Sequence, residues 1–359
     1  MQKYVLHLTK PKQEGLSKSL GILMNLEERI RAFALLGQSI VSIPAEIKEE
    51  LVLNVKNQNS WFTESSVEIA LKGISRFLSA ENLATWTSSY PLHPATTKKI
   101  GLAMAGNIPL VGFHDYLCVL LSGHHLVAKL SSQDSVLIQF LTRELVRIEP
   151  RFTDYIHFEE LLKGIDAVIA TGSDNTSRYF EYYFRHIPRI IRKNRTSCAV
   201  LSGEEPAEEL TRLGIDVFTY FGLGCRNVSK LFVPEGYSFT PLLDSWQGYA
   251  EVGHHHKYAN NYDYQKSILL VNGIPFLDNG FVMLTKNEAS VSPISVLFYE
   301  EYKDPNDLHL KLTAHREKTQ CIVAAKGWYK ESVPFGEAQF PEAWDYADKV
   351  DTLQFLSAL

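Results

Sequence analysis

Short apolar runs that alternate with amphipathic segments are the feature that most restricts how this chain can fold. Three such runs, at 99–105, 125–130 and 166–170, read as strands that are apolar on both faces. Segments with helical periodicity lie between them, at 113–122 and 131–149. Strands of this kind, alternating with helices, are typical of a parallel sheet covered by helices on both sides. The sequence therefore predicts a doubly wound α/β fold.

The same pattern predicts where ligands bind, because such sheets bind them just beyond the C-terminal ends of their strands. The three strand ends fall at Gly106–Asn107, Lys129–Ser132 and Thr171-Gly172-Ser173. The last of these also opens a helix, whose free N–H groups favour a phosphate, although Thr and Ser are ordinary helix caps as well. The lysine of the second can bind a ligand or simply extend to solvent.

A second α/β region is expected beyond about residue 205. Residues 204–214 have the pattern of a helix, and apolar runs that follow it predict strands. We therefore expect N-terminal helices and a first α/β domain in 1–203, a second α/β domain in 204–335, and a tail in 336–359 that packs back or forms an oligomer contact. Helical periodicity is also present at 18–36 and 65–79, and the later strands are expected at 230–234, 266–271, 281–285, 295–299 and 321–325.

Charge and cysteine content exclude several classes of protein. The net charge of −5 argues against a nucleic-acid partner, because a protein that binds nucleic acid usually carries a basic stripe. The four cysteines are scattered and form no C-x-x-C pair, which argues against a disulfide framework or a thiolate zinc site and favours a reducing compartment. The N-terminus has no apolar signal segment, and the most apolar stretch carries Asn107, Pro109, His114 and Asp115. We therefore expect a cytoplasmic protein without a transmembrane segment.

Cys225 is the candidate nucleophile. It follows Gly222 and Gly224, which permit a close approach of the backbone to a ligand, and Arg226 could stabilise a thiolate. A buried filler is the alternative, and Cys118, Cys198 and Cys321 are interpreted in that way because they lie in apolar runs.

Two other patterns do not predict a site. The G-x-G before Cys225 is no dinucleotide loop, because Asn227 stands where a third glycine is needed and a strand is expected to follow. The triplet His254-His255-His256 is a poor metal chelator, because adjacent side chains diverge in both helix and strand. No metal site is predicted.

Four segments, in order along the chain, resemble motifs of the aldehyde dehydrogenase superfamily. "AGNIPLVGFHDYLCVLLSGHHLVAKLSSQDSVL" is similar to P-W-N-x-P-L followed by A-G-N-x-V-V-x-K-P-S-E, and "IATGSDNTSRYF" to F-T-G-S-T. "FGLGCRNVSKLFVPEG" resembles the nucleophile segment G-Q-x-C-x-x-x-x-R-L-F-V, and "NEASVSPISVLFYEEYKD" a degenerate E-E-I-F-G-P-V. The segment "HHKYANNYDYQKS" and the tail resemble the fatty acyl-CoA reductases of the bacterial luminescence type.

The resemblance implies an aldehyde dehydrogenase-like fold, with an NADP-binding Rossmann-type domain and a catalytic cysteine domain. Cys225 falls on the family's nucleophile, and Asn107 on the amide that forms an oxyanion hole with the Cys225 N–H. Lys129 falls on the lysine that contacts the adenosine ribose or its 2′-phosphate, and Ser173 on the serine that meets the pyrophosphate. Ser132 replaces the family's glutamate that holds the ribose hydroxyls of NAD, which favours NADPH.

Two further departures concern the reaction. Ile191 falls where the family has its general-base glutamate, which argues against hydrolysis of an acyl-enzyme to a free acid. Ala289 falls on the glutamate of E-I-F-G-P, with Glu288 one residue away, so no nicotinamide-ribose contact is assigned. The expected activity is NADPH-dependent reduction of an acyl-CoA or acyl-protein thioester to an aldehyde by a homodimer. A thioester-cleaving acyltransferase that uses Cys225, and a non-catalytic acyl or nucleotide binder, remain the alternatives.

Overall fold

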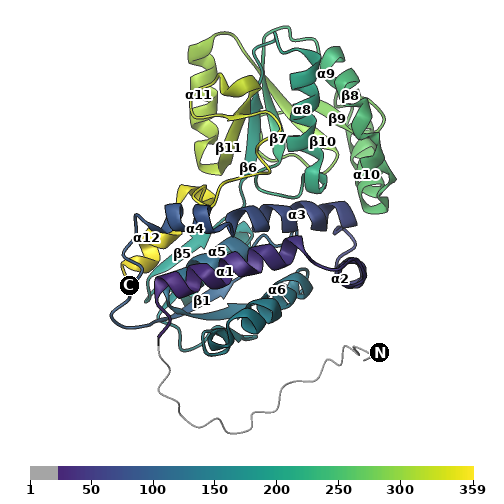
Figure 1. The fold of residues 1–359 in the computed structure, drawn as a ribbon. Coiled ribbons are helices and arrows are strands. Elements are labelled where there is room, and N and C mark those ends of the chain that lie inside the picture. The colour runs from purple at the N-terminus through teal and green to yellow at the C-terminus, as the bar shows by residue number, and fades with distance from the viewer. Residues whose placement is uncertain (1–22) are drawn as a thin grey trace.

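The computed structural model describes residues 23–359, which form two α/β units stacked on each other (Figure 1). The first unit is built on a five-stranded sheet with the order β3-β2-β1-β4-β5, and every neighbouring pair in it is parallel. This is the strand order of a Rossmann-type sheet. Its strands are β1 (Lys99–Ala103), β2 (His125–Lys129), β3 (Ile156–Phe158), β4 (Ala167–Thr171) and β5 (Arg189–Arg192).

Helices cover both faces of this sheet. One face carries the large core cluster, to which α6 contributes Leu137, Ile138, Leu141 and Leu145, spaced along one side of the helix. On the other face, Phe180 and Phe184 pack against strand residues. The helices of this unit are α1 (Leu26–Val41), α2 (Ala45–Gln58), α3 (Glu64–Phe77), α4 (Ala80–Thr87), α5 (Phe113–Ser122), α6 (Ser135–Ile148) and α7 (Asp174–Tyr183).

The second unit holds a seven-stranded sheet with the order β12-β11-β6-β7-β10-β9-β8. All pairs are parallel except β8 with β9 at one edge. Helices α8 (Ala207–Phe218), α9 (Thr240–Ser245), α10 (His256–Val271) and α11 (Pro305–His315) flank the sheet. Its strands are β6 (Thr196–Val200), β7 (Val228–Pro234), β8 (Leu277–Asp278), β9 (Met283–Lys286), β10 (Val296–Tyr302), β11 (Thr319–Ala324) and β12 (Val333–Pro334).

Two sequence expectations are wrong. The run 266–271, expected to be a strand, is the last part of α10, because the apolar residues there continue a longer helix that begins at His256. The domain boundary expected at 203–204 lies too late, because β6 pairs with β7 and β11 of the second sheet. The helix expected at 18–36 is α1, Leu26–Val41, and residues 18–22 lie outside the described part of the chain.

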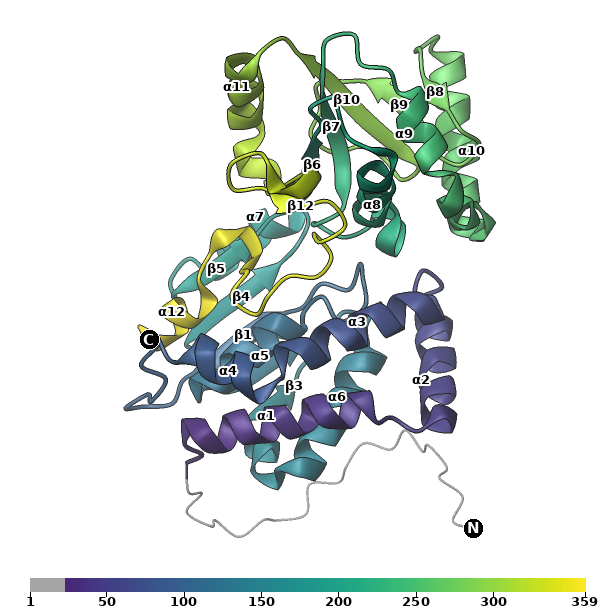
Figure 2. The same cartoon turned by 45° about the horizontal axis from the view of Figure 1, so that its top comes forward.

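The C-terminal tail runs back from the second unit to the first (yellow in Figure 2). It starts on α8, where the carboxylate of Asp216 accepts hydrogen bonds from the N–H groups of Gly336 and Ala338 at 2.7 and 3.0 Å. It ends in α12 (Thr352–Ser357), whose Leu353 and Leu356 are buried in the core of the first unit. The tail therefore joins the two units and contributes to the cores of both.

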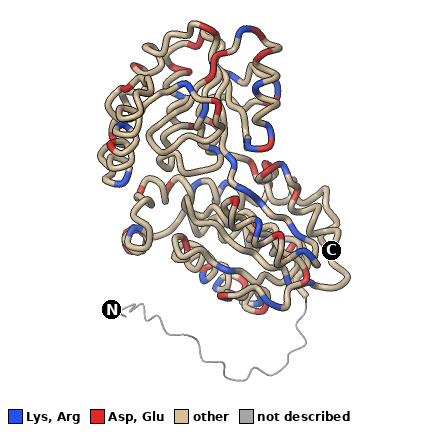
Figure 3. The backbone as a smooth tube through the Cα atoms, turned by 180° about the vertical axis from the view of Figure 1, so that it is seen from behind, with Lys and Arg blue, Asp and Glu red and all other residues tan. Residues whose placement is uncertain are grey.

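Charges of both signs lie on both units (Figure 3). Between residues 23 and 359, no single helix is long and apolar enough to cross a membrane; α1 and α2 meet that test only as a pair, with a bend of 94° between them. The buried residues of α1, among them Phe33 and Leu36, belong to the core of the first unit.

Candidate active site

Cys225 lies in the loop between the short helix η2 (Thr219–Gly222) and β7, and it lines a cavity of about 550 Å³. Its side chain is partly exposed, whereas Cys118 and Cys198 are buried. The cavity extends between the two units and its wall is mostly apolar. Much of that wall comes from α3 and from the segment after β1, through Ile69, Ala70, Ile74, Phe77, Ile108 and Leu110. Cys225 is thus accessible to a ligand that carries a hydrocarbon group.

The side chain of Asn227 organises the loop that carries Cys225. Its Oδ1 accepts a hydrogen bond from the Gly224 N–H at 2.8 Å. Its Nδ2 donates to the carbonyls of Asp216 and Thr219 at 3.0 and 2.8 Å. The Ser197 hydroxyl, from β6, donates to the Cys225 carbonyl at 3.0 Å. These contacts fix the loop to α8 and to the sheet, and sequence reasoning missed them because Asn227 was considered only as a missing glycine.

The turn before Cys225 has an unusual backbone. Tyr220, Phe221 and Gly222 all adopt left-handed conformations, with φ of 53°, 58° and 79°. Glycine tolerates this region, but for a residue with a Cβ it costs roughly 1–2 kcal/mol. Two consecutive aromatic residues held in this way indicate that the surrounding contacts determine the shape of the turn.

Asn107 reaches the same loop from the first unit. It is exposed, and its Nδ2 donates to the Leu223 carbonyl at 2.7 Å. An amide nitrogen carries two hydrogens, so one remains for a ligand. The Cys225 N–H donates to no acceptor among residues 23–359. The structure therefore brings Asn107 to the loop that carries Cys225, although Asn107 itself does not line the cavity of about 550 Å³. The shared role of Asn107 and the Cys225 N–H as oxyanion donors stays a prediction.

The surroundings of Cys225 do not stabilise a thiolate in the way that the sequence predicts. Burial raises the pKa of the Cys225 thiol above its ordinary value, and the charges of Arg226 and Arg192 lower it only in part. The Arg226 guanidinium is directed to the tail, where it donates to the Asp345 carbonyl at 2.9 Å. Arg192 forms a buried ion pair with Asp115. The thiol is therefore mostly protonated at neutral pH before a ligand binds.

Lys129 and Ser132 line a second cavity, of about 940 Å³, beside the C-terminal ends of β2 and β3. Both are exposed. The Ser132 carbonyl accepts a hydrogen bond from Nε2 of Gln58 at 2.9 Å, and the Gln58 side chain also caps the start of α6. The segment from Lys129 to Ser132 contains no carboxylate. The other Lys and Glu residues that line the cavity are Lys99, Lys163, Glu159 and Glu160.

Thr171, Gly172 and Ser173 connect β4 to α7, as the sequence predicts. The Ser173 hydroxyl caps α7 by accepting from the Thr176 N–H at 3.3 Å. These three residues do not line the cavity that contains Lys129 and Ser132. They lie at the C-terminal end of β4, which is separated from β2 by β1 in the same sheet. The cap is the local role that the structure shows for Ser173.

Ile191 lies on β5, and its side chain packs against an apolar cluster that includes Val168 and Ala170. The next residue, Arg192, is buried and donates through Nη2 to the Thr352 hydroxyl at 2.8 Å, in addition to its ion pair with Asp115. Residues 191–195 contain no carboxylate. The strand end that resembles the general-base motif therefore carries no carboxylate in place of the family's glutamate.

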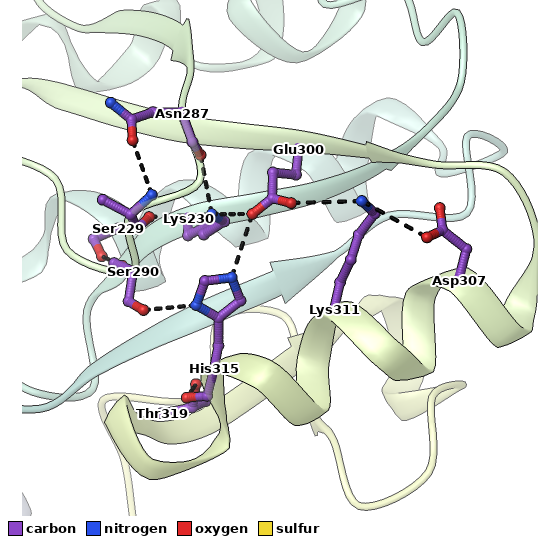
Figure 4. Close-up of polar contacts among 10 residues, drawn as sticks. Ser229, Lys230, Asn287, Ser290, Glu300, Asp307, Lys311, His315 and Thr319 are labelled. Carbon is purple, nitrogen blue, oxygen red and sulfur yellow. Dashed lines mark hydrogen bonds and ion pairs between the residues drawn. The ribbon is translucent and has the colours of Figure 1, made fainter.

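The loop that follows β9 contains Ala289 and is held by a polar network (Figure 4). The buried Lys230 donates to the carbonyls of Asn287 and Ala289 at 3.0 and 3.1 Å and pairs with Glu300. His315 bridges Glu300 and the hydroxyl of Ser290, with its Nδ1 2.7 Å from that oxygen. Burial lowers the pKa of His315. The network fixes this loop to β7, β10 and α11.

Comparison with solved structures identifies the fold. An aldehyde dehydrogenase of Mycobacterium tuberculosis, complexed with NAD+, is 14% identical, and the match covers 83% of this chain and 73% of that one with a TM-score of 0.61. An AldC mutant from Pseudomonas syringae, complexed with NAD+ and octanal, is 13% identical, with coverage of 84% and 72% and a TM-score of 0.61. The chain has the aldehyde dehydrogenase fold.

An NADP-dependent enzyme of E. coli matches equally well, at 12% identity, 84% and 73% coverage and a TM-score of 0.61. No family model and no curated protein matches the sequence. At such identities the likeness to aldehyde dehydrogenases establishes the fold, and nothing in it is specific to the luminescence-type reductases. The reaction has to be inferred from the site itself.

The histidine triplet lies at the junction of η3 (Gln247–His254) and α10, and only its middle member is engaged with the first unit. His254 and His256 are exposed, whereas Nε2 of His255 lies 2.8 Å from the Ser60 carbonyl. In residues 23–359, no three His, Cys, Asp or Glu side chains form a group that could hold a metal ion.

Proposed function

We propose that the chain reduces acyl thioesters, acyl-CoA or acyl-protein, to aldehydes with NADPH, through an acyl-enzyme on Cys225. The observation that carries this proposal is the combination at one cavity of a fixed, partly exposed cysteine and an apolar wall, on a fold that lacks a carboxylate at 191–195. The mutant AldC structure, with an aliphatic aldehyde bound to the same fold, supports an apolar substrate.

In the first half-reaction the Cys225 sulfur attacks the thioester carbonyl carbon and a new C–S bond forms. The thiol must lose its proton for this step, and Arg226 and Arg192 favour the thiolate. In this proposal Asn107 and the Cys225 N–H would donate to the oxyanion, and loss of one such donor typically costs ~100–1,000-fold in rate. The carbon–sulfur bond to the carrier then breaks, and the carrier leaves as a thiol, with a proton that balances the one Cys225 lost.

The cavity beside Lys129 suits a nucleotide that carries several phosphates. Three lysines and two glutamates line it, so positive charge is in excess. Lys129 would pair with a 2′-phosphate, and Ser132 brings no carboxylate that would repel one. NADPH bound there would supply a hydride to the acyl carbon. Cys225 would carry the resulting hemithioacetal, whose C–S bond would break to give the aldehyde, and the Cys225 sulfur would take up a proton.

The absence of a base at 191–195 determines the fate of the acyl-enzyme. A positioned base typically accelerates such a step by ~100–10,000-fold. Ile191 offers no such group, so water attacks the acyl-enzyme slowly. We therefore expect the acyl-enzyme to persist without NADPH and to yield aldehyde, not acid, when NADPH is added. A cytoplasmic homodimer is the form in which we expect it to act.

The test is to load the enzyme with labelled acyl-CoA, divide the sample, and follow label and product with and without NADPH. Mass spectrometry should locate the acyl group on Cys225. Cys225→Ala should abolish both labelling and turnover, while Cys321→Ala, the other partly exposed cysteine, should label normally. Rapid release of free acid without NADPH would instead indicate a thioesterase. Labelling followed by transfer to another thiol, with no use of NADPH, would indicate the acyltransferase.

A further inference from the structure

His255 connects the two units through a single hydrogen bond and a stacked ring. The Ser60 carbonyl can only accept, so Nε2 of His255 carries the hydrogen of the 2.8 Å contact. The same imidazole stacks on Trp61, with ring centres 4.8 Å apart and planes 11° apart. Burial lowers the pKa of His255, which favours the neutral ring in this stack. Ser60 and Trp61 belong to the first unit, and His255 is the N-cap residue of α10 in the second.

Phe221, from the loop that carries Cys225, packs at a tilt against both of these rings. Its ring centre lies 4.5 Å from that of His255 and 5.5 Å from that of Trp61. Phe221 is also one of the two non-glycine residues in the left-handed turn before Cys225. Because that backbone conformation is unfavourable for a residue with a Cβ, the turn would relax unless its side chain were held. The rings of Trp61 and His255 contact it most closely, and the buried Tyr258 lies farther away, with ring centres 6.1 Å apart.

The loop that carries Trp61 is itself well fixed and leads into the cavity wall. The Trp61 N–H donates to Oδ1 of Asn59 at 3.1 Å, and the Phe62 N–H donates to the Asn59 carbonyl at 2.9 Å. Asn59 and Phe62 are buried. Helix α3 starts two residues later and supplies much of the apolar wall near Cys225. One short segment is thus in contact with the nucleophile turn and continuous with the wall that faces the same cavity.

We propose that Trp61, His255 and Phe221 form an aromatic clamp that positions the Cys225 loop against α3 and so sets the rate at which Cys225 is acylated. The three are positioning residues, since none of them lines the cavity that contains Cys225. The effect on acylation rests on the proposed function. The effect on the shape of the turn does not, and it is measured separately.

The clamp makes two rates change in opposite directions when it is removed. Acylation by a thioester needs the sulfur and the oxyanion donors in register, and small misplacements cost up to ~100-fold. Alkylation by a small reagent such as iodoacetamide needs access to the thiol, which relaxation of the turn increases. Trp61→Ala should therefore lower acylation of Cys225 by about tenfold or more and raise its alkylation several-fold. Trp61→Phe should restore most of both rates.

The histidine triplet supplies a matched control. His255→Asn should change both rates in the same directions as Trp61→Ala, whereas His254→Asn, at an exposed neighbour, should match the wild type. Binding of NADPH should be unchanged in all variants, because the clamp does not line the cavity beside Lys129. The buried Cys118 and Cys198 report on global unfolding, and they should stay unreactive.

The outcomes separate the two hypotheses. If the wild type is not acylated by any thioester, the proposed function fails, while the alkylation rates still test the clamp. If Trp61→Ala and His255→Asn both alkylate and acylate within twofold of the wild type, the clamp is wrong. If alkylation of Cys118 and Cys198 rises together with that of Cys225, the ring stack stabilises the whole fold and does not position the nucleophile.

Discussion

The loop that carries Cys225, here called the nucleophile loop, and the C-terminal end of β2 differ in how their residues are held. Around Cys225, buried side chains from distant parts of the chain bind the backbone: Asn227 is 1% exposed and Ser197 fully buried. At and just after the C-terminal end of β2, Lys129 and Ser132 are exposed. A reacting atom has to be placed within a fraction of an ångström, whereas phosphate groups tolerate a looser set of charges. Substitutions in the nucleophile loop should therefore lower both stability and the acylation rate, whereas those at the end of β2 should change cofactor binding alone.

Asn227→Ala should have the largest effect, because it removes the hydrogen bonds that hold the nucleophile loop. Buried partners left unsatisfied cost about 1–3 kcal/mol each. We expect the acylation rate of Cys225 to fall by ~100-fold and the melting temperature to fall by several degrees. The exposed Asn194 gives the control, and Asn194→Ala should leave both unchanged. A variant that keeps its rate would show that the loop is held by other contacts.

Ser132→Glu should act on cofactor choice alone. A carboxylate beside Lys129 repels a 2′-phosphate and competes for the lysine, so the preference for NADPH over NADH in kcat/KM should fall by about tenfold, equivalent to about 1.4 kcal/mol. The melting temperature should not change. Gln133→Glu adds the same charge at the next residue, which is exposed and does not line the cavity, and should have little effect. Equal use of both cofactors by the wild type would contradict the reading of Ser132.

Asp134 tests whether the comparison holds for a buried group near the C-terminal end of β2, and its effect should be on the pH dependence of stability and the smallest of the three on acylation and cofactor choice. Burial raises the pKa of Asp134 to about 8, while its carboxylate accepts from the Leu110 N–H at 2.7 Å. Because the folded-state pKa lies above the unfolded value near 4, stability should fall as pH rises between those two values. Asp134→Asn should remove that slope, measured as melting temperatures from pH 5 to pH 8. An identical slope in both proteins would place the titration elsewhere.

The strand runs and the strand-end residues could be predicted from sequence because both depend on local patterns. The runs at 99–105, 125–130 and 166–170 contain β1, β2 and most of β4, and Ser173 caps the helix that it precedes. A buried strand needs only consecutive apolar residues, and a cap needs only the right side chain at a helix start. These features require no knowledge of what packs against them.

The contacts around Cys225 could not be predicted, because they join residues far apart in sequence. The Ser197 hydroxyl and the Cys225 carbonyl are 28 residues apart, and the His255–Ser60 bond spans 195 residues. Residues 266–271 show the opposite error. Their apolar run matches a buried strand as well as the end of a helix, and only the packing of α10 distinguishes the two. The pattern of side chains was sufficient for the elements but not for their assembly.

The returning tail determines the order in which the cavity can form during synthesis. Residues 339–341 line the cavity, and the bond between His124 and the Leu356 carbonyl spans 232 residues. The ribosome adds this segment after both sheets, so a nascent chain with both sheets folded still has an open cavity and a first unit without Leu353 and Leu356 in its core. Its cysteine is then accessible to any electrophile in the surroundings. Docking of the tail adds residues 339–341 to the wall of the cavity beside the thiol, so we expect the reactivity of Cys225 to change at this late step of folding.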